Sequence, residues 1–129
     1  MTEQVKNSSD VPVCIYSRAL ELISNKWTPY ILYELEKGSV RYGELKRRLE
    51  GISKKMLTQT LRQLERDGFV DRKITYTNPP MVHYSLTELG KTILSPLKSL
   101  RQWSLRHYAT VEKARAVYDK KQSNHNKID

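Results

Sequence analysis

Residues 54–66 place leucines and polar side chains on opposite sides of a helical repeat. The leucines are Leu57, Leu61 and Leu64, and the polar side chains opposite them are Lys54, Lys55, Thr58, Gln59, Arg62 and Arg66. Lys and Arg bind phosphates or guanine, whereas Thr and Gln can form hydrogen bonds with base edges. An ordinary solvated helix face has the same composition, so the neighbouring elements must decide between the two interpretations.

A second set of polar residues follows in a segment where the spacing of the apolar residues changes from helical to alternating. Residues 70–77 and 82–86 alternate between apolar and polar side chains around the turn Asn78-Pro79-Pro80, which predicts a β-hairpin. On this hairpin we expect Arg72, Lys73, Thr77 and Asn78 to contact DNA, together with Arg41 and Ser53 near the helices. A basic hairpin beside a basic helix favours the DNA-binding interpretation.

The remaining elements have to position these two groups. We expect helices after Pro12, after Thr28-Pro29, from Tyr42 to Leu49, after the N-cap Ser53, and after the N-cap Thr87, with a short edge strand at Ser39–Arg41. The third and fourth helices, joined by residues 50–52, have the spacing of a helix-turn-helix. The predicted fold class is therefore mainly α with a small β-hairpin, a winged helix-turn-helix.

The last helical region has an apolar stripe that is long for so small a protein. Its members follow one another at steps of three or four residues from Leu89 to Tyr118, and we expect Pro96 to kink the helix early. A single small domain cannot cover so much apolar surface, which predicts a homodimer. Two copies would bind a palindromic operator, with their fourth helices about 34 Å apart.

The length of the chain fits a single domain, and its positive net charge fits an anionic binding partner. The chain has 129 residues and a net charge of +9. Residues 41–77 hold ten basic and five acidic side chains, and residues 91–129 hold nine and three. We expect a flexible start at 1–11, a single domain at 12–118 and a polar, disordered tail at 119–129. The start of the chain lacks a signal-peptide pattern, which favours a cytoplasmic protein.

The sequence has few residue patterns that are typical of a catalytic or metal-binding site. The only cysteine is Cys14, and His83, His107 and His125 have no metal-ligand spacing. No nucleophile–base pair or phosphate-binding loop is recognisable. We therefore expect neither an enzyme nor a bound cofactor.

Several blocks resemble one known family in a fixed order. GISKKMLTQTLRQLERDGFVDRK resembles the recognition-helix block of the HxlR-type family, a branch of the MarR-like winged-helix regulators. Asn25-Lys26-Trp27 resembles its Lys-Trp motif, residues 41–46 its Arg-Phe-x-Glu-Leu block, and residues 78–90 its wing and Tyr-Ser-Leu-Thr-x-x-Gly block. The resemblance, over about residues 12–105, implies a dimeric one-component transcription factor whose first and last helices form the interface.

The resemblance also implies a sensing role for Cys14. Several family members use a cysteine at this place as a redox or electrophile switch, although Ile15 and Ser24-Asn25 depart from the usual proline and glycines. A helix N-terminus favours the reactive thiolate, while a free cysteine can also be only a small packing residue. A bridge between two copies, a mixed disulfide and a covalent adduct all remain open.

Two other functions remain open on the sequence alone. One is a MarR-like regulator controlled by a noncovalent ligand such as a small aromatic effector. The other is a helical module that binds protein and not DNA. Salt-sensitive binding to a palindrome would exclude the helical module, and an effect of thiol reagents would favour Cys14 over a noncovalent ligand.

Overall fold

The computed structural model describes residues 14–128, with side chains up to residue 126. The start that we expected to be flexible, residues 1–11, lies outside the described residues. The chain divides into two compact units, residues 1–94 and 95–129, and each is described by itself.

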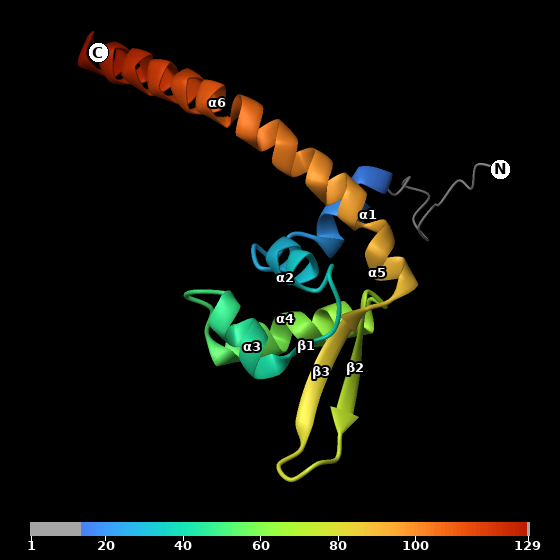
Figure 1. Ribbon diagram of the computed structural model, residues 1–129. Coiled ribbons are helices and arrows are strands. Elements are labelled where there is room, and N and C mark those ends of the chain that lie inside the picture. The colour runs from blue at the N-terminus through green and yellow to red at the C-terminus, as the bar shows by residue number, and fades with distance from the viewer. Residues whose placement is uncertain (1–13, 129) are drawn as a thin grey trace, which may run out of the picture. The chain divides into compact units, whose positions relative to one another are not determined.

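The first unit contains a helix-turn-helix and a hairpin. Its elements are α1 (Ile15–Leu22), α2 (Thr28–Glu34), β1 (Val40–Arg41), α3 (Tyr42–Arg48), α4 (Lys54–Arg66), β2 (Val70–Thr75), β3 (Met81–Leu86) and α5 (Glu88–Thr92) (Figure 1). This order confirms the predicted winged helix-turn-helix. In α2 the N-cap is Trp27, so Thr28 begins the helix and does not cap it.

The three strands form an antiparallel sheet in the order β1-β3-β2. In β3, Tyr84 pairs with Val40 on one side and with Arg72 on the other, and it is buried. The alternation expected in β2 is incomplete, because Asp71, Arg72 and Lys73 are all exposed. The hairpin extends beyond the helices (Figure 1), and Ile74 and Thr75, nearer its tip, are half-buried.

The core of this unit lies between the helices and the base of the hairpin. Its largest fully buried side chains are Ile31, Leu32, Leu35, Leu45, Leu57, Leu61, Leu64, Val70 and Thr60. Ser53 caps α4 by accepting a hydrogen bond from the Met56 N–H at 3.0 Å, and Thr87 caps α5 in the same way from Gly90. These caps, both predicted, satisfy N–H groups that have no partner within the helix.

The second unit belongs to one long helix, α6 (Leu94–Ile128). The helical path ends at Thr92 and resumes at Leu94, slightly before the kink expected at Pro96. Proline has no N–H to donate to the carbonyl four residues earlier, which is that of Thr92. α6 also includes residues 119–128, where we expected disorder. No glycine or proline follows Pro96, and Lys and Gln propagate a helix well.

Candidate nucleic-acid interface

One face of α4 is apolar and buried, and the opposite face is polar and exposed. Leu57, Leu61 and Leu64 are at most 1% exposed, as their helical spacing predicts. The predicted DNA-contacting residues Lys54, Lys55, Gln59 and Arg62 are all exposed, and so are Ser53 and Arg66. The acidic side chains near this face, Glu65 and Asp67, lie in or after the last turn of α4. The face is therefore basic along most of its length.

Thr58 differs from its neighbours on this face because it is half-buried. Its hydroxyl lies 2.9 Å from the hydroxyl of Tyr42, the first residue of α3. The Tyr42 hydroxyl also donates a hydrogen bond to the backbone carbonyl of Lys54 at 3.2 Å. Tyr42 thus connects the start of α3 to the first half of α4.

The hairpin brings some of the predicted residues next to α4 and separates others from it. Arg72 lines a cleft of about 360 Å³ whose other lining residues are Tyr42, Thr58, Arg62, Glu65 and Tyr84. Lys73 is the next residue in β2 and therefore points to the other face of the sheet. Thr77 and Asn78 are exposed at the far end of the hairpin, where the Thr77 hydroxyl donates to the Pro79 carbonyl at 2.8 Å.

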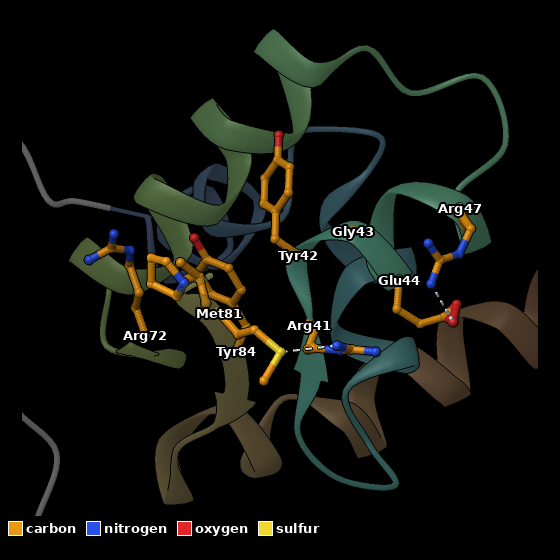
Figure 2. A pocket seen from close by; sticks show the side chains of 10 residues that line it. Arg41, Tyr42, Gly43, Glu44, Arg47, Arg72, Met81 and Tyr84 are labelled. Atoms are coloured by element: carbon orange, nitrogen blue, oxygen red, sulfur yellow. Dashed lines mark hydrogen bonds and ion pairs between the residues drawn. The ribbon is translucent and has the colours of Figure 1, made fainter. Parts of the chain in front are cut away.

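A second cleft, of about 440 Å³, lies between the start of α3 and the hairpin (Figure 2). Arg41, Arg47 and Arg72 line it, and one guanidinium nitrogen of Arg41 donates to the Met81 sulfur at 3.0 Å. The lone carboxylate in the lining, Glu44, accepts a hydrogen bond from Arg47 at 3.2 Å. This bond and the Arg47 charge lower the pKa of Glu44, so it stays ionised and offsets part of the positive charge.

Tyr84 forms part of the wall of both clefts. Burial raises the pKa of Tyr84, and the neighbouring Arg72 guanidinium opposes that rise only in part. The phenol is therefore neutral at physiological pH and adds no negative charge to the basic surface.

Cys14 immediately precedes α1, where it is the N-cap residue and is exposed. The backbone N–H of Ser17, then that of Tyr16 and the Ser17 hydroxyl, lower the pKa of the Cys14 thiol. A lowered pKa raises the fraction of the nucleophilic thiolate at neutral pH. The position thus combines access for a reagent with thiolate stabilisation.

Two residues with structural roles at this interface were missed from the sequence. The sequence predicted Tyr42 only as the start of the third helix, although a tyrosine in a block that usually has phenylalanine was a signal. Asn25 accepts from the Trp27 N–H at 2.8 Å and donates to the Thr60 hydroxyl on α4 at 3.2 Å. Its partner on α4 is 35 residues away in sequence, so no local pattern predicted that contact.

Among the described residues, no group of His, Cys, Asp and Glu side chains is arranged to hold a metal ion. In the same part of the chain, no helix combines the length and the apolar character that crossing a membrane requires.

The fold and the polar face of α4 define a winged helix-turn-helix, and comparisons with known proteins agree. Residues 22–112 match the HxlR-like helix-turn-helix family. The HTH-type transcriptional regulator YkvN of Bacillus subtilis (strain 168) is 43% identical over 106 residues, which are 82% of this chain and 89% of YkvN.

Solved structures with the same fold include two informative neighbours. The reduced form of the redox regulator HypR has a TM-score of 0.73 at 33% identity, covering 78% of this chain and 99% of that one. A structure assigned to the MarR family, from Porphyromonas gingivalis W83, has a TM-score of 0.69 at 30% identity, covering 81% and 99%. This chain belongs to the HxlR-like helix-turn-helix family of transcription regulators, within the MarR-like group, as the sequence motifs predicted.

Proposed function

We propose that this transcription regulator acts in the cytoplasm as a homodimer that binds a palindromic double-stranded operator. The observation that carries the proposal is the exposed polar face of α4, which lies opposite three buried leucines. A helix of this kind fits the major groove, where Thr58 and Gln59 would contact base edges and Lys54, Lys55 and Arg62 would contact phosphates or guanine. Arg41, Ser53 and the hairpin residues Arg72, Lys73, Thr77 and Asn78 would hold the DNA backbone.

The test is DNA binding as a function of salt. A duplex selected by the protein from a random pool should bind with an affinity that falls steeply as salt rises, since phosphate contacts release counterions. Arg72→Ala should weaken binding to every sequence and make the salt dependence shallower. Lys91→Ala is the matched control, because Lys91 is exposed on α5 and forms an ion pair with Glu88. No selection of a duplex from the pool, and no binding to DNA at low salt, would instead favour the protein-binding module.

We further propose that oxidants or electrophiles control DNA binding through Cys14. The thiol is exposed, its pKa is lowered, and the similar protein HypR is a redox regulator solved in reduced and oxidized forms. Two Cys14 thiolates could give two electrons to an oxidant and form one bridge between copies, and one Cys14 thiolate with a small thiol could give two electrons to the same oxidant and form a mixed disulfide. An electrophile would instead form a covalent adduct with the thiolate, without an oxidant.

The comparison that tests this control is operator affinity before and after diamide, for the wild type and Cys14→Ser. A shift of about tenfold in the wild type alone would support the proposal. An equal shift in Cys14→Ser, or no shift in either protein, would show that Cys14 does not control DNA binding.

Control by a noncovalent ligand is the second candidate, and the cleft in Figure 2 favours it. Its volume of about 440 Å³ suits a small ligand, and three of its lining residues, Arg41, Arg47 and Arg72, are arginines that would attract an anionic group. Because Arg41 and Arg72 are also proposed DNA contacts, a ligand bound there would compete with DNA. Aromatic carboxylates that lower operator affinity equally in the wild type and Cys14→Ser would support this candidate.

A further inference from the structure

We propose that the hydroxyl of Tyr42 determines how Thr58 can contact a base, which makes Tyr42 a positioning residue for sequence specificity. This inference rests on the proposed DNA binding through α4. It concerns the direction of one hydroxyl proton, and Tyr42 itself need not contact DNA.

The geometry joins three groups from two helices. The Tyr42 hydroxyl oxygen lies 2.9 Å from the Thr58 hydroxyl oxygen and 3.2 Å from the Lys54 carbonyl oxygen. Lys54 and Thr58 are one turn apart in α4, so Tyr42 contacts the same side of that helix twice. Figure 2 shows the Tyr42 ring extending from the start of α3 in a different direction from the neighbouring Arg41.

The distribution of protons among these groups follows from elementary hydrogen-bond chemistry. A carbonyl oxygen can only accept, so we assign the single Tyr42 proton to the Lys54 carbonyl. Either hydroxyl could be the donor in the Tyr42–Thr58 contact, and with the Tyr42 proton directed to Lys54 it is Thr58 that donates its proton to the Tyr42 oxygen. Thr58 is left with acceptor lone pairs and its methyl group for any DNA placed against α4.

A threonine in this state favours some bases over others. Its lone pairs can accept from the amino group of adenine or cytosine, and its methyl group can contact the thymine methyl. It cannot donate to the acceptors of guanine, O6 and N7, or to O4 of thymine. The Tyr42 hydroxyl thus discriminates against guanine at the base pair that faces Thr58.

The variant Tyr42→Phe removes one oxygen atom and keeps the ring. Thr58 would regain a free proton, so the preference against guanine at one operator position should fall by roughly threefold to tenfold. Other operator positions should keep their preferences. Thr58→Val keeps the branched shape and the threonine methyl group but lacks the hydroxyl. It is the second variant, which tests whether the effect of Tyr42 requires the Thr58 hydroxyl.

The experiment measures the affinity of the wild type, Tyr42→Phe, Thr58→Val and the double variant for operators that carry each base pair at each position. The proposal predicts a change at one position in Tyr42→Phe, and no effect of the same substitution in the Thr58→Val background. An unchanged profile, a uniform loss at all positions, or a shift that persists without the Thr58 hydroxyl would overturn it. Wild-type protein that binds no operator would instead contradict the proposed function, and thermal unfolding of each variant verifies that it is folded.

Discussion

The chemistry of Cys14 depends on the free N–H groups at the start of α1. Those of Ser17 and Tyr16, with the Ser17 hydroxyl, lower the pKa of the thiol in the folded chain. Alkylation follows the thiolate fraction, so the rate falls as the pH drops through the pKa. The folded protein should therefore keep reacting with iodoacetamide at pH values where the unfolded chain has slowed, and Ser17→Ala should move the midpoint upwards.

Mass spectrometry of the alkylation rate from about pH 5 to about pH 10, with and without denaturant, checks this expectation. The chain has one cysteine, so every alkylated molecule reports on this thiol. Identical midpoints for folded and unfolded protein would show that the helix end has no influence on it.

Asn25 holds the turn before α2 to the middle of α4. Its carbonyl accepts from the Trp27 N–H and its amide donates to Thr60, which is only 2% exposed. Asn25→Ala removes both bonds and should lower the free energy of unfolding by about 1–2 kcal/mol. Ser24→Ala removes one exposed hydroxyl and should change it by less than about 0.5 kcal/mol. Urea unfolding compares the two variants, and equal midpoints would contradict the role given to Asn25.

Single residues were predictable where their role depends on near neighbours in sequence. Ser53 and Thr87 were identified as N-caps because a cap bonds to a backbone N–H three residues later. Tyr42 and Asn25 were not identified, because their partners Thr58 and Thr60 lie on another helix, 16 and 35 residues away. Only the packing of α4 on the preceding elements creates those bonds.

At the scale of elements, the junction between the hairpin and α5 leaves no space for a side chain at Gly90. A Cβ on Gly90 would overlap the carbonyl oxygen of Phe69, which also accepts from the Thr87 N–H at 3.0 Å. Gly90→Ala should therefore destabilise the protein by about 1–3 kcal/mol, because backbone must move.

Gly43 provides the matched control for this substitution. It lies in α3, and a Cβ there would meet no atom within 4 Å. Gly43→Ala should leave stability unchanged or raise it by up to about 1 kcal/mol, since alanine propagates a helix better than glycine. Thermal unfolding distinguishes the two variants, and similar losses in both would show that Gly90 is not closely packed.

The order of the elements was predictable because each has its own period and end signals. The differences arose where a segment has no core to face. Asp71, Arg72 and Lys73 in β2 are exposed on both faces of the sheet, so the alternation there did not predict burial, and residues 119–128 form helix without an apolar stripe to predict it. A kink was expected at Pro96, but the helical path breaks at Ile93, and Pro96 lies inside the first turn of α6.

At the scale of the whole molecule, the main question is what covers the exposed apolar face of α6. Leu100 and Trp103 are 53% and 52% exposed, and Tyr118 is 62% exposed. They share one face with Leu97, Val111 and Ala114 at steps of three or four residues. The stripe itself predicted a homodimer, but the residues of the second copy that would cover this face were not predictable from one chain, because the covering surface belongs to the assembly.

We expect a second copy of the chain to cover this face, because a palindromic operator needs two recognition helices related by a twofold axis. Light scattering at micromolar concentration should give about twice the chain mass of 15.1 kDa. Leu100→Glu combined with Trp103→Glu would place charges in the apolar contact, and should reduce the mass to one chain and abolish the preference for a palindrome over a half-site. Leu105→Glu is the control, since Leu105 is 66% exposed but lies off the stripe, and it should remain dimeric. A wild-type mass of one chain, or loss of the dimer in the control alone, would show that α6 does not pair through this face.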